Sequence, residues 1–292
     1  MKRIIPIFVL LFAVSISQAK TVEVETAYAG SSHFDKVQAR ATAALNLNVQ
    51  AGLEATFAKE HHVFKKPVYS VSVPVLLDLD LVKFRFRPFY YFKNKSDIAE
   101  YQDASAFGLH TDLILTLNDD TVNDIYTRAF IGAAFAHQKG TVFFNSRPDE
   151  NRYYSQLAYT LGFEQAMYRA FNFRLMGSVF QYPDGISSVA GIRSVMDQQE
   201  LADMQTLDII HNLPKYAVGA RMARLWADNN SAFYVAYHFT KYYTTDSEHS
   251  ILVGNSFPVT RQINFDVAYN HLLDVHNRNR RDIWQARITA AF

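Results

Sequence analysis

The sequence predicts an all-β protein, a transmembrane antiparallel up-and-down β-barrel of 12–14 strands, with 14 as the best count. Three observations predict this fold class. Apolar and polar residues alternate with a period of two through most of the chain. The N-terminus has the features of an export signal, yet no later segment is long enough for a spanning helix. Aromatic residues make up 14% of the chain and gather where strands are expected to end.

The composition excludes several classes of function. Lys and Arg number 29 against 28 Asp and Glu, so the chain lacks the basic excess that phosphate neutralisation requires, and we expect no nucleic-acid partner. The chain has no cysteine. Disulfides, thiolate metal sites, cysteine nucleophiles and lipid attachment to an N-terminal cysteine are therefore excluded.

Residues 1–19 are predicted to be a signal peptide. Met1-Lys2-Arg3 is basic, residues 4–14 are almost wholly apolar, and Ser17-Gln18-Ala19 ends in small residues at the positions that signal peptidase reads. A membrane anchor is the alternative, but these 11 apolar residues fall short of the ~20 that a spanning helix needs. We therefore expect residues 20–292 to form a single barrel domain.

The alternation defines the expected strands. In one of them, Tyr69, Val71 and Val73 alternate with Ser70 and Ser72. A period of two gives a strand one apolar and one polar face. The expected strands are 21–29, 37–46, 50–58, 68–77, 81–93, 104–117, 124–137, 153–165, 170–182, 215–226, 231–243, 249–256, 261–273 and 281–292.

Short and long connections alternate between these strands, as they do in barrels with short periplasmic turns and long external loops. The long ones are 59–67, 94–103, 138–152 and 183–214. Within the last of these, residues 194–207 are rich in helix formers and contain neither Gly nor Pro. A short helix that covers or enters the barrel mouth and an idle surface loop both fit this composition.

The end of the chain carries a resemblance to a known class. Trp284, Ala286, Ile288, Ala290 and Phe292 fall on one face of the expected last strand. An alternating final strand that ends in Phe resembles the C-terminal signature of bacterial outer-membrane β-barrel proteins. The resemblance implies a location in the outer membrane of a Gram-negative bacterium, in contact with its lipid. It also implies recognition by the barrel-assembly machinery, with Trp284, Ile288 and Phe292 as the assembly signal.

The length of the chain narrows this resemblance, and one alternative fold has to be weighed against it. The size is similar to that of monomeric porin-type barrels and of solitary autotransporter-type barrels. A soluble, exported β-sandwich is the alternative fold, since alternation also suits its core. It is disfavoured because such a protein has no need for aromatic residues at both ends of its strands.

The polar faces of the strands are expected to line the interior. The residues expected there are Lys83, Arg85, Arg87, Arg128, Arg174, Arg221 and Arg287, with Glu54, Asp112, Glu164 and Asp266. Lys83, Arg85 and Arg87 form a ladder of cations on one strand. The ladder is either a track for anionic solutes or a set of ion-pair partners for carboxylates on neighbouring strands.

No catalytic or metal site is expected, so the protein is not predicted to be an enzyme or to need a cofactor. Outer-membrane lipid hydrolases place His two residues before Ser, and none of the ten histidines here has that spacing. The sequence therefore favours a porin-like diffusion channel for small hydrophilic solutes, with anions as a candidate class. The alternative is a non-conducting barrel that acts in surface interaction or envelope structure through connections 138–152 and 183–214.

Overall fold

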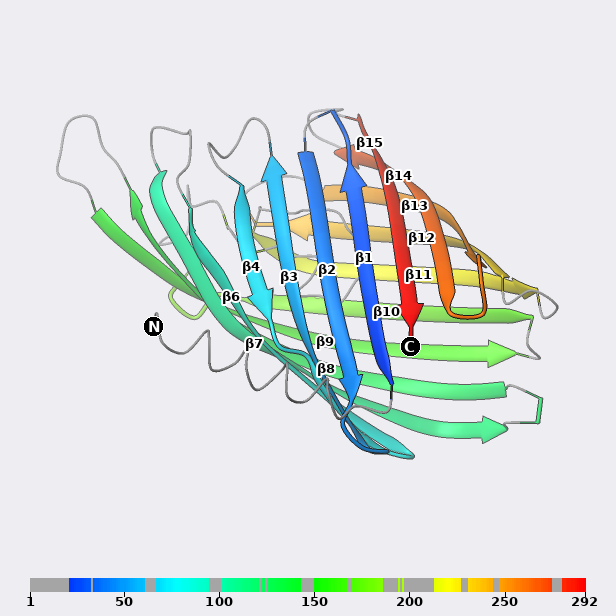
Figure 1. Ribbon diagram of the computed structural model, residues 1–292. Coiled ribbons are helices and arrows are strands. Elements are labelled where there is room, and N and C mark those ends of the chain that lie inside the picture. Colours follow the sequence, from blue (N-terminus) through cyan, green and yellow to red (C-terminus); the bar gives the residue numbers. More distant parts are fainter. Residues whose placement is uncertain are drawn as a thin grey trace.

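The structure is a computed structural model, shown in Figure 1. It describes residues 21–32, 34–60, 67–94, 101–120, 122–123, 125–142, 150–167, 170–185, 194, 196, 213–226, 231–243, 247–274 and 280–292. The predicted signal peptide lies outside the described residues. So does the predicted loop helix at 194–207, apart from Ser194 and Met196.

The described residues form one antiparallel sheet. Its strands are β1 (Val22–Gly30), β2 (Phe34–Ala44), β3 (Val49–Glu60), β4 (Val68–Ser72), β5 (Val75–Leu79), β6 (Val82–Asn94), β7 (Tyr101–Asp120), β8 (Ile125–Val142), β9 (Glu150–Met167), β10 (Phe171–Gln181), β11 (Pro214–Trp226), β12 (Ser231–Tyr242), β13 (Ser247–Pro258), β14 (Ile263–Asp274) and β15 (Arg280–Ala291). Within the described residues, no helix is long and apolar enough to cross a membrane.

The sheet closes on itself. Strands next to each other in the sequence pair antiparallel, and β1 also pairs with β15 from Glu23 opposite Ala291 to Gly30 opposite Trp284. In Figure 1 the first and last strands lie side by side. The amide of Phe292 donates to the carbonyl of Val22 at 2.8 Å, which seals the seam at one end. The predicted up-and-down barrel is confirmed.

The barrel has 14 strands, because β4 and β5 are two parts of one strand. Both parts pair with β3 and with β6 in an unbroken register. The interruption lies at Pro74, which has no N–H to donate to the ladder. Its carbonyl still accepts a hydrogen bond from Gly52 at 2.8 Å. The predicted count of 14 is therefore confirmed and the count of 12 is wrong.

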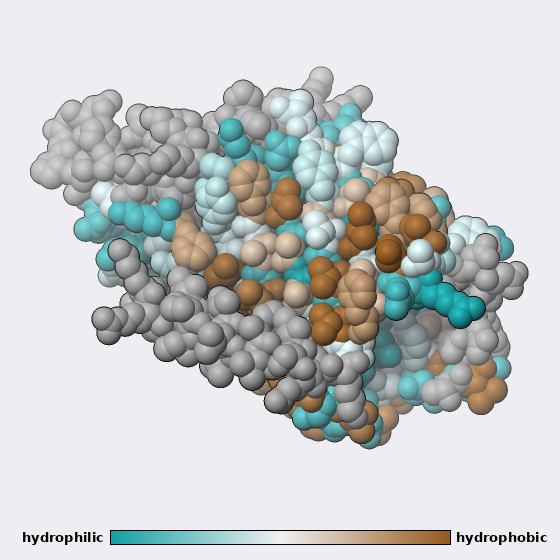
Figure 2. All heavy atoms as spheres, viewed as in Figure 1, coloured by the Kyte–Doolittle hydropathy of each residue, from teal (hydrophilic) through white to brown (hydrophobic). Residues whose placement is uncertain are grey.

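The barrel is apolar outside and polar inside. Leu161 and Met222 point outward and are 66% and 56% exposed, whereas Gln156 and Asn270 point inward and are 1% or less exposed. Figure 2 shows hydrophobic side chains over the outside of the wall. A soluble domain buries apolar side chains and exposes polar ones. The soluble β-sandwich is therefore the wrong alternative, and the arrangement is that of a membrane barrel.

Aromatic residues form a girdle at each end of the outer surface. Tyr216 and Trp226 lie at opposite ends of β11, and both face outward. Ten residues of strand, at about 3.3 Å each and tilted by about 40°, span roughly 25 Å, which is the height of the apolar band of a transmembrane barrel. Further outward aromatics include Tyr69, Phe107, Tyr153 and Trp284 near one end, and Phe171 and Phe292 near the other.

Not every aromatic that was expected at the outer ends joins this girdle. In the neighbouring tyrosine pairs Tyr153–Tyr154 and Tyr242–Tyr243, one ring is exposed and the other is buried. Tyr153 is 62% exposed whereas Tyr154 is fully buried, and Tyr243 is 39% exposed whereas Tyr242 is buried. The reason is the same period of two, which sends adjacent side chains to opposite faces of the wall.

Several strands, among them β7, β8 and β9, are longer than the sequence indicated. β7 begins at Tyr101, β8 continues to Val142, and β9 begins at Glu150, opposite Val142. The connections predicted at 94–103 and 138–152 are shorter as a result. The added strand residues are mostly polar on both faces, so the hydrophobic alternation that marks a spanning strand is absent there.

Candidate functional site in the barrel interior

Fourteen charged side chains form a belt around the interior. They lie in the half of the barrel nearer the end that holds Val22 and Phe292, here called the inner half. The charged belt consists of Glu25, Arg40, Glu54, Asp78, Lys83, Arg85, Arg87, Asp112, Arg128, Glu164, Arg174, Arg221, Asp266 and Arg287.

All eleven residues that the sequence placed on the polar face belong to this belt. The sequence reasoning missed Glu25, Arg40 and Asp78. Glu25 and Arg40 lie opposite each other on β1 and β2, the strands whose alternation was weakest. Asp78 was assigned to a turn, although it pairs with Lys83 in a hairpin. On their own strands, alternation with the apolar Val24 and Val37 would have placed Glu25 and Arg40 on the polar face.

Near the junction of β1 and β15, the charges of the belt are balanced by ion pairs. Arg40 lies 3.0 Å from one oxygen of Glu25, and Arg287 lies 3.7 Å from the other oxygen. Arg287 also stands opposite Asp266 in the β14–β15 register. Charges alternate in sign across these strands, so this side of the wall presents little net charge to the lumen.

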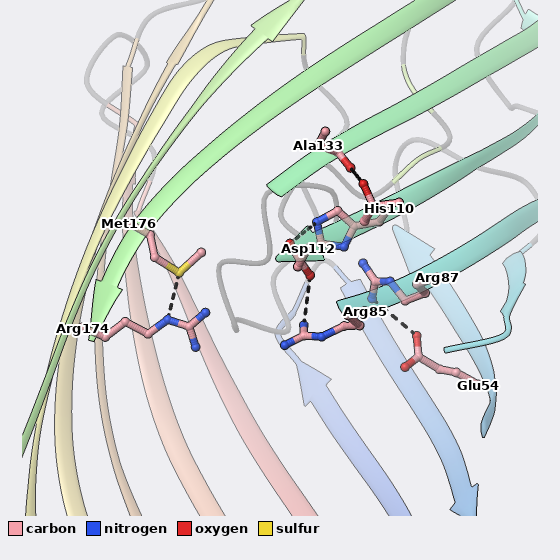
Figure 3. Close-up of polar contacts among 9 residues, drawn as sticks. Glu54, Arg85, Arg87, His110, Asp112, Ala133, Arg174 and Met176 are labelled. Atoms are coloured by element: carbon pink, nitrogen blue, oxygen red, sulfur yellow. Dashed lines mark hydrogen bonds and ion pairs between the residues drawn. The ribbon is translucent and has the colours of Figure 1, made fainter. Parts of the chain in front are cut away.

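The ladder on β6 is also paired. Lys83 contacts Asp78, Arg85 lies 3.5 Å from Asp112, and Arg87 lies 4.0 Å from Glu54. Figure 3 shows Arg85 and Arg87 reaching these carboxylates. These contacts favour the structural interpretation of the ladder over the anion track. Three cations meet three carboxylates here, so their fields largely cancel.

His110 completes this paired group. Its Nε2 lies 3.2 Å from Oδ1 of Asp112, and both side chains are buried on the inner face of β7. Asp112 thus lies between His110 and Arg85, as Figure 3 shows. The two side chains share the inner face of β7 within ion-pair distance, but in the described part of the chain His110 Nε2 makes no hydrogen bond.

A second part of the belt, on β8 to β11, has an excess of positive charge. Four charged residues form a row across neighbouring strands. In the strand register, Arg128 pairs with Glu164, Glu164 with Arg174, and Arg174 with Arg221. This basic sector has three arginines and one glutamate, a net charge of +2. The rest of the belt has five basic and five acidic residues, so the whole excess lies on this side.

The one carboxylate of the basic sector is held by neutral donors. The hydroxyl of Tyr126 donates to Glu164 Oε1 at 2.7 Å, and the side-chain amide of Asn172 donates to the same oxygen at 2.8 Å. Neither Arg128 nor Arg221 lies within 4 Å of a carboxylate in the described part of the chain.

The guanidinium groups of the basic sector instead lie over aromatic rings. Arg128 lies 4.1 Å from the ring centroid of Tyr126, Arg174 lies 4.6 Å from that of Phe130, and Arg221 lies 4.3 Å from that of Tyr234. Such cation–π contacts contribute about 0.5–2 kcal/mol each. For Arg128 and Arg221, these contacts hold the cation against the wall without cancelling its charge. Figure 3 shows Arg174 directed into the barrel, with its Nε toward Met176.

The outer half of the interior contains a packed aromatic and apolar cluster, and its wall also carries the buried Lys36 and the Glu248–Arg281 ion pair. Tyr154, Phe180 and Tyr182 form a buried cluster with Met196 and Leu213, here called the mouth cluster. The Tyr182 hydroxyl donates to the carbonyl of Pro214 at 3.1 Å. Burial raises the pKa of Tyr182, which keeps this donor neutral. The described part of connection 183–214 therefore packs against the inner wall.

A serine–histidine contact lies on the outer surface. His137 Nδ1 is 3.1 Å from Ser155 Oγ, across the β8–β9 pair. Sequence spacing could not reveal it because the two residues come from different strands. A nucleophilic dyad needs a third group that orients the histidine. The rings of Phe107 and Tyr153 lie beside His137, and the amide of Ser155 donates to Asp184 Oδ2 at 2.6 Å. In the described part of the chain, no carboxylate accepts a hydrogen bond from His137 itself.

Comparison with known proteins gives a likeness of fold. No protein-family model matches the chain, and no curated protein matches it. Among solved structures, the monoaromatic hydrocarbon channel CymD is similar at 7% identity and a TM-score of 0.53, covering 93% of this chain and 87% of that one.

Two other similar structures have lower scores. The KdgM porin in complex with disordered oligogalacturonate has 7% identity and a TM-score of 0.46, covering 92% of this chain and 99% of that one. The β domain of the Bordetella autotransporter BrkA has 9% identity and a TM-score of 0.40, covering 92% and 97%. At such identities the likeness concerns architecture alone. With its closed sheet, its apolar outside and its likeness to CymD, the chain has the fold of bacterial outer-membrane β-barrels.

Proposed function

We propose that this protein is a porin-like diffusion channel for small hydrophilic solutes, with a preference for anions. The observation that carries the proposal is the charged belt inside a closed 14-strand barrel, with its net charge of +2 on one side. Lys83, Arg85 and Arg287 face inward, yet their side chains are 28%, 31% and 37% exposed. Inside a closed wall, that exposure corresponds to space within the inner half of the lumen. Charged residues on a lumen wall set the ion preference of a pore.

The proposed location is the outer membrane of a Gram-negative bacterium. The apolar band of roughly 25 Å and its two aromatic girdles support contact with lipid. The basic and apolar N-terminus supports export, with cleavage near Ala19. Assembly by the barrel-assembly machinery, through Trp284, Ile288 and Phe292, belongs to the same proposal.

Single-channel recording tests the function. Protein purified from outer membranes in detergent is added to a planar bilayer with a KCl gradient across it. We expect discrete steps of current. We also expect a reversal potential that lies closer to the equilibrium potential of chloride than to that of potassium. Replacing Arg128 and Arg221 by Gln removes the excess of the basic sector and should move the reversal potential toward that of potassium.

The matched control is the double variant Arg85→Gln/Asp112→Asn, which removes an ion pair of the same belt and leaves its net charge unchanged. We expect its reversal potential to stay at the value of the unmodified protein. A folded protein that conducts without ion preference would contradict the anion preference. A folded protein that never conducts would contradict the channel itself.

The mouth cluster favours a second candidate function. Met196 and Leu213 are buried among inward-facing aromatic residues of the outer half, where they narrow the lumen. A barrel closed in this way would act in surface interaction or envelope structure, through its long connections. Absence of current from well-folded protein is the result that this second function predicts.

A further inference from the structure

We infer that the basic sector is a binding site for a small divalent oxyanion, such as a dicarboxylate or inorganic phosphate. The site consists of Arg128 on β8, Arg174 on β10 and Arg221 on β11. The inference deepens the proposed channel function, because it assigns a class of solute to a defined part of the wall. It goes beyond a general preference for anions, since it requires saturable binding.

The first argument is the arrangement of like charges. Arg174 and Arg221 stand directly opposite each other on neighbouring strands. Like charges at directly opposed positions destabilise a sheet. Glu164 is the one acidic residue in this sector, and its Oε1 already accepts hydrogen bonds from Tyr126 and Asn172. An anion bound between the arginines would offset this repulsion.

The second argument is an unused donor. The Nε of Arg128 is buried and has no hydrogen-bond partner in the structure. A buried N–H without a partner costs about 1–3 kcal/mol, and more when the group is charged. Arg128 lies opposite Glu164, whose Oε1 accepts hydrogen bonds from Tyr126 and Asn172. A ligand oxygen would satisfy the donor.

The third argument is geometry. Directly opposed side chains on neighbouring strands have Cβ atoms about 5 Å apart, so Arg174 and Arg221 can reach one ligand together. Guanidinium groups present planar pairs of donors that match carboxylate and phosphate oxygens. Their contacts with Phe130 and Tyr234 limit where the guanidinium groups can move. Arg128 and Arg221 are only partly buried, which leaves them within reach of a solute in the lumen.

Charge also selects the ligand. The sector has a net charge of +2, which a divalent anion neutralises and a monovalent anion does not. The paired sectors of the belt have no comparable excess. Binding is therefore expected at β8 to β11 and not at the Lys83–Arg85–Arg87 ladder.

Thermal unfolding in the presence of anions tests the inference without any measurement of transport. Protein purified from outer membranes is heated in detergent with increasing sodium succinate, sodium phosphate or sodium chloride, at matched ionic strength. Succinate and phosphate separate the carboxylate and phosphate sources of the same oxyanion chemistry. We expect at least one of them to raise the unfolding temperature in a saturable manner, and chloride to leave it nearly unchanged.

Variants locate the site. Arg128→Gln and Arg221→Gln should each weaken the binding about tenfold, because each removes a charge-assisted hydrogen bond. Arg221→Lys keeps the charge but loses the planar donor pair, and it should also weaken binding. The control Arg85→Gln/Asp112→Asn should bind like the unmodified protein. Heat-modifiable migration in gels shows that each variant is folded.

The outcomes are distinct. If neither divalent anion stabilises the protein beyond chloride, or if the control loses binding as fully as Arg128→Gln and Arg221→Gln do, the inference is wrong. An anion-preferring current without saturable binding of succinate or phosphate would support the channel function and contradict the proposed binding site. Saturable binding without current would support the site and overturn the channel function.

Discussion

Tyr234 shows how single residues hold the charged belt in place. Its ring lies on Gly254 of the neighbouring strand, where a Cβ atom would come within 2.3 Å of the ring. Its hydroxyl donates to Asp266 at 2.8 Å, and its ring lies under the guanidinium of Arg221. Because Gly254 has no side chain, the ring of Tyr234 can lie at that position and support the guanidinium of Arg221 on β11.

Substitution of Gly254 by Ala should disturb this arrangement. We expect Gly254→Ala to lower the free energy of unfolding by about 1–3 kcal/mol, because the added methyl group overpacks a buried site. Unfolding by urea of protein inserted in vesicles measures the change. The control is Gly177→Ala, whose Cβ would have its nearest contact at 3.9 Å, from Ala217. Equal stability of the two variants would contradict the packing described for Tyr234.

The sequence predicted the inner face for eleven of the fourteen charged residues of the belt, but the partner of each depends on more than one strand. The face depends only on alternation within one strand, so all eleven predicted residues lie on the inner wall. The partner depends on register between strands and on barrel closure. Arg287 and Glu25 meet only because β15 pairs with β1. Pairing of Arg85 and Arg87 with carboxylates on neighbouring strands was one of the two interpretations of the sequence, but which carboxylate each arginine meets depends on register. The unbalanced sector on β8 to β11 likewise depends on register.

At the scale of elements, the last strand closes the barrel through its backbone. The amides and carbonyls of Val22 and Phe292 bond to each other at 2.8 and 3.0 Å. The Phe292 side chain, by contrast, points outward and is 68% exposed. The side chain thus contributes little packing within the folded chain, which leaves recognition during assembly, or contact with lipid, as its role.

Replacing Phe292 by Ala separates these roles. We expect Phe292→Ala to change the unfolding free energy of the refolded protein by no more than about 0.5 kcal/mol, as for most surface substitutions. In cells, the amount of folded protein in the outer membrane should fall clearly. The comparison of refolded stability with cellular yield is the measurement. A normal cellular yield would contradict a role for Phe292 in the assembly signal.

The connection between β10 and β11 is expected to limit the flow of solutes. Met196 and Leu213 are buried against the inner wall in the outer half. Replacing residues 186–212 by a short Gly-Ser linker should raise the single-channel conductance, because it removes Met196 from the lumen. The ion preference should stay the same, since the charged belt is untouched. The same replacement of residues 143–149 serves as the control, and an equal rise there would contradict a specific role for Met196.

The sequence predicted the elements unevenly for a physical reason. Spanning strands alternate because one face meets lipid, and these were found. Beyond the membrane that constraint ends, so the polar extensions of β7, β8 and β9 were missed. Pro74 interrupts the hydrogen bonds of a strand but not its alternation, and the strand was therefore found whole.

At the scale of the whole molecule, the interior has two unlike halves. The inner half carries the charged belt. The outer half holds the mouth cluster and buried polar residues such as Gln138 and Gln156, with Lys36 and the Glu248–Arg281 pair as its charged groups. A solute that enters from the inner end meets charge before it meets a constriction. In the proposed channel, the excess positive charge of the basic sector would raise the local concentration of anions on the inner side of the mouth cluster.

The two tryptophans of the chain allow the position of the whole barrel in the membrane to be measured. Trp226 lies in the inner girdle and Trp284 in the outer one, and both face outward, 44% and 66% exposed. The variants Trp226→Phe and Trp284→Phe each keep one tryptophan. Each is inserted into vesicles of lipids brominated at a defined depth of the acyl chain, and the quenching of tryptophan fluorescence is measured. Because interfacial tryptophans sit at the level of the headgroups, we expect bromines near the headgroup to quench both variants best. Stronger quenching by bromines at the bilayer centre would contradict the placement of the girdles, and absence of quenching would contradict a lipid-facing outer surface.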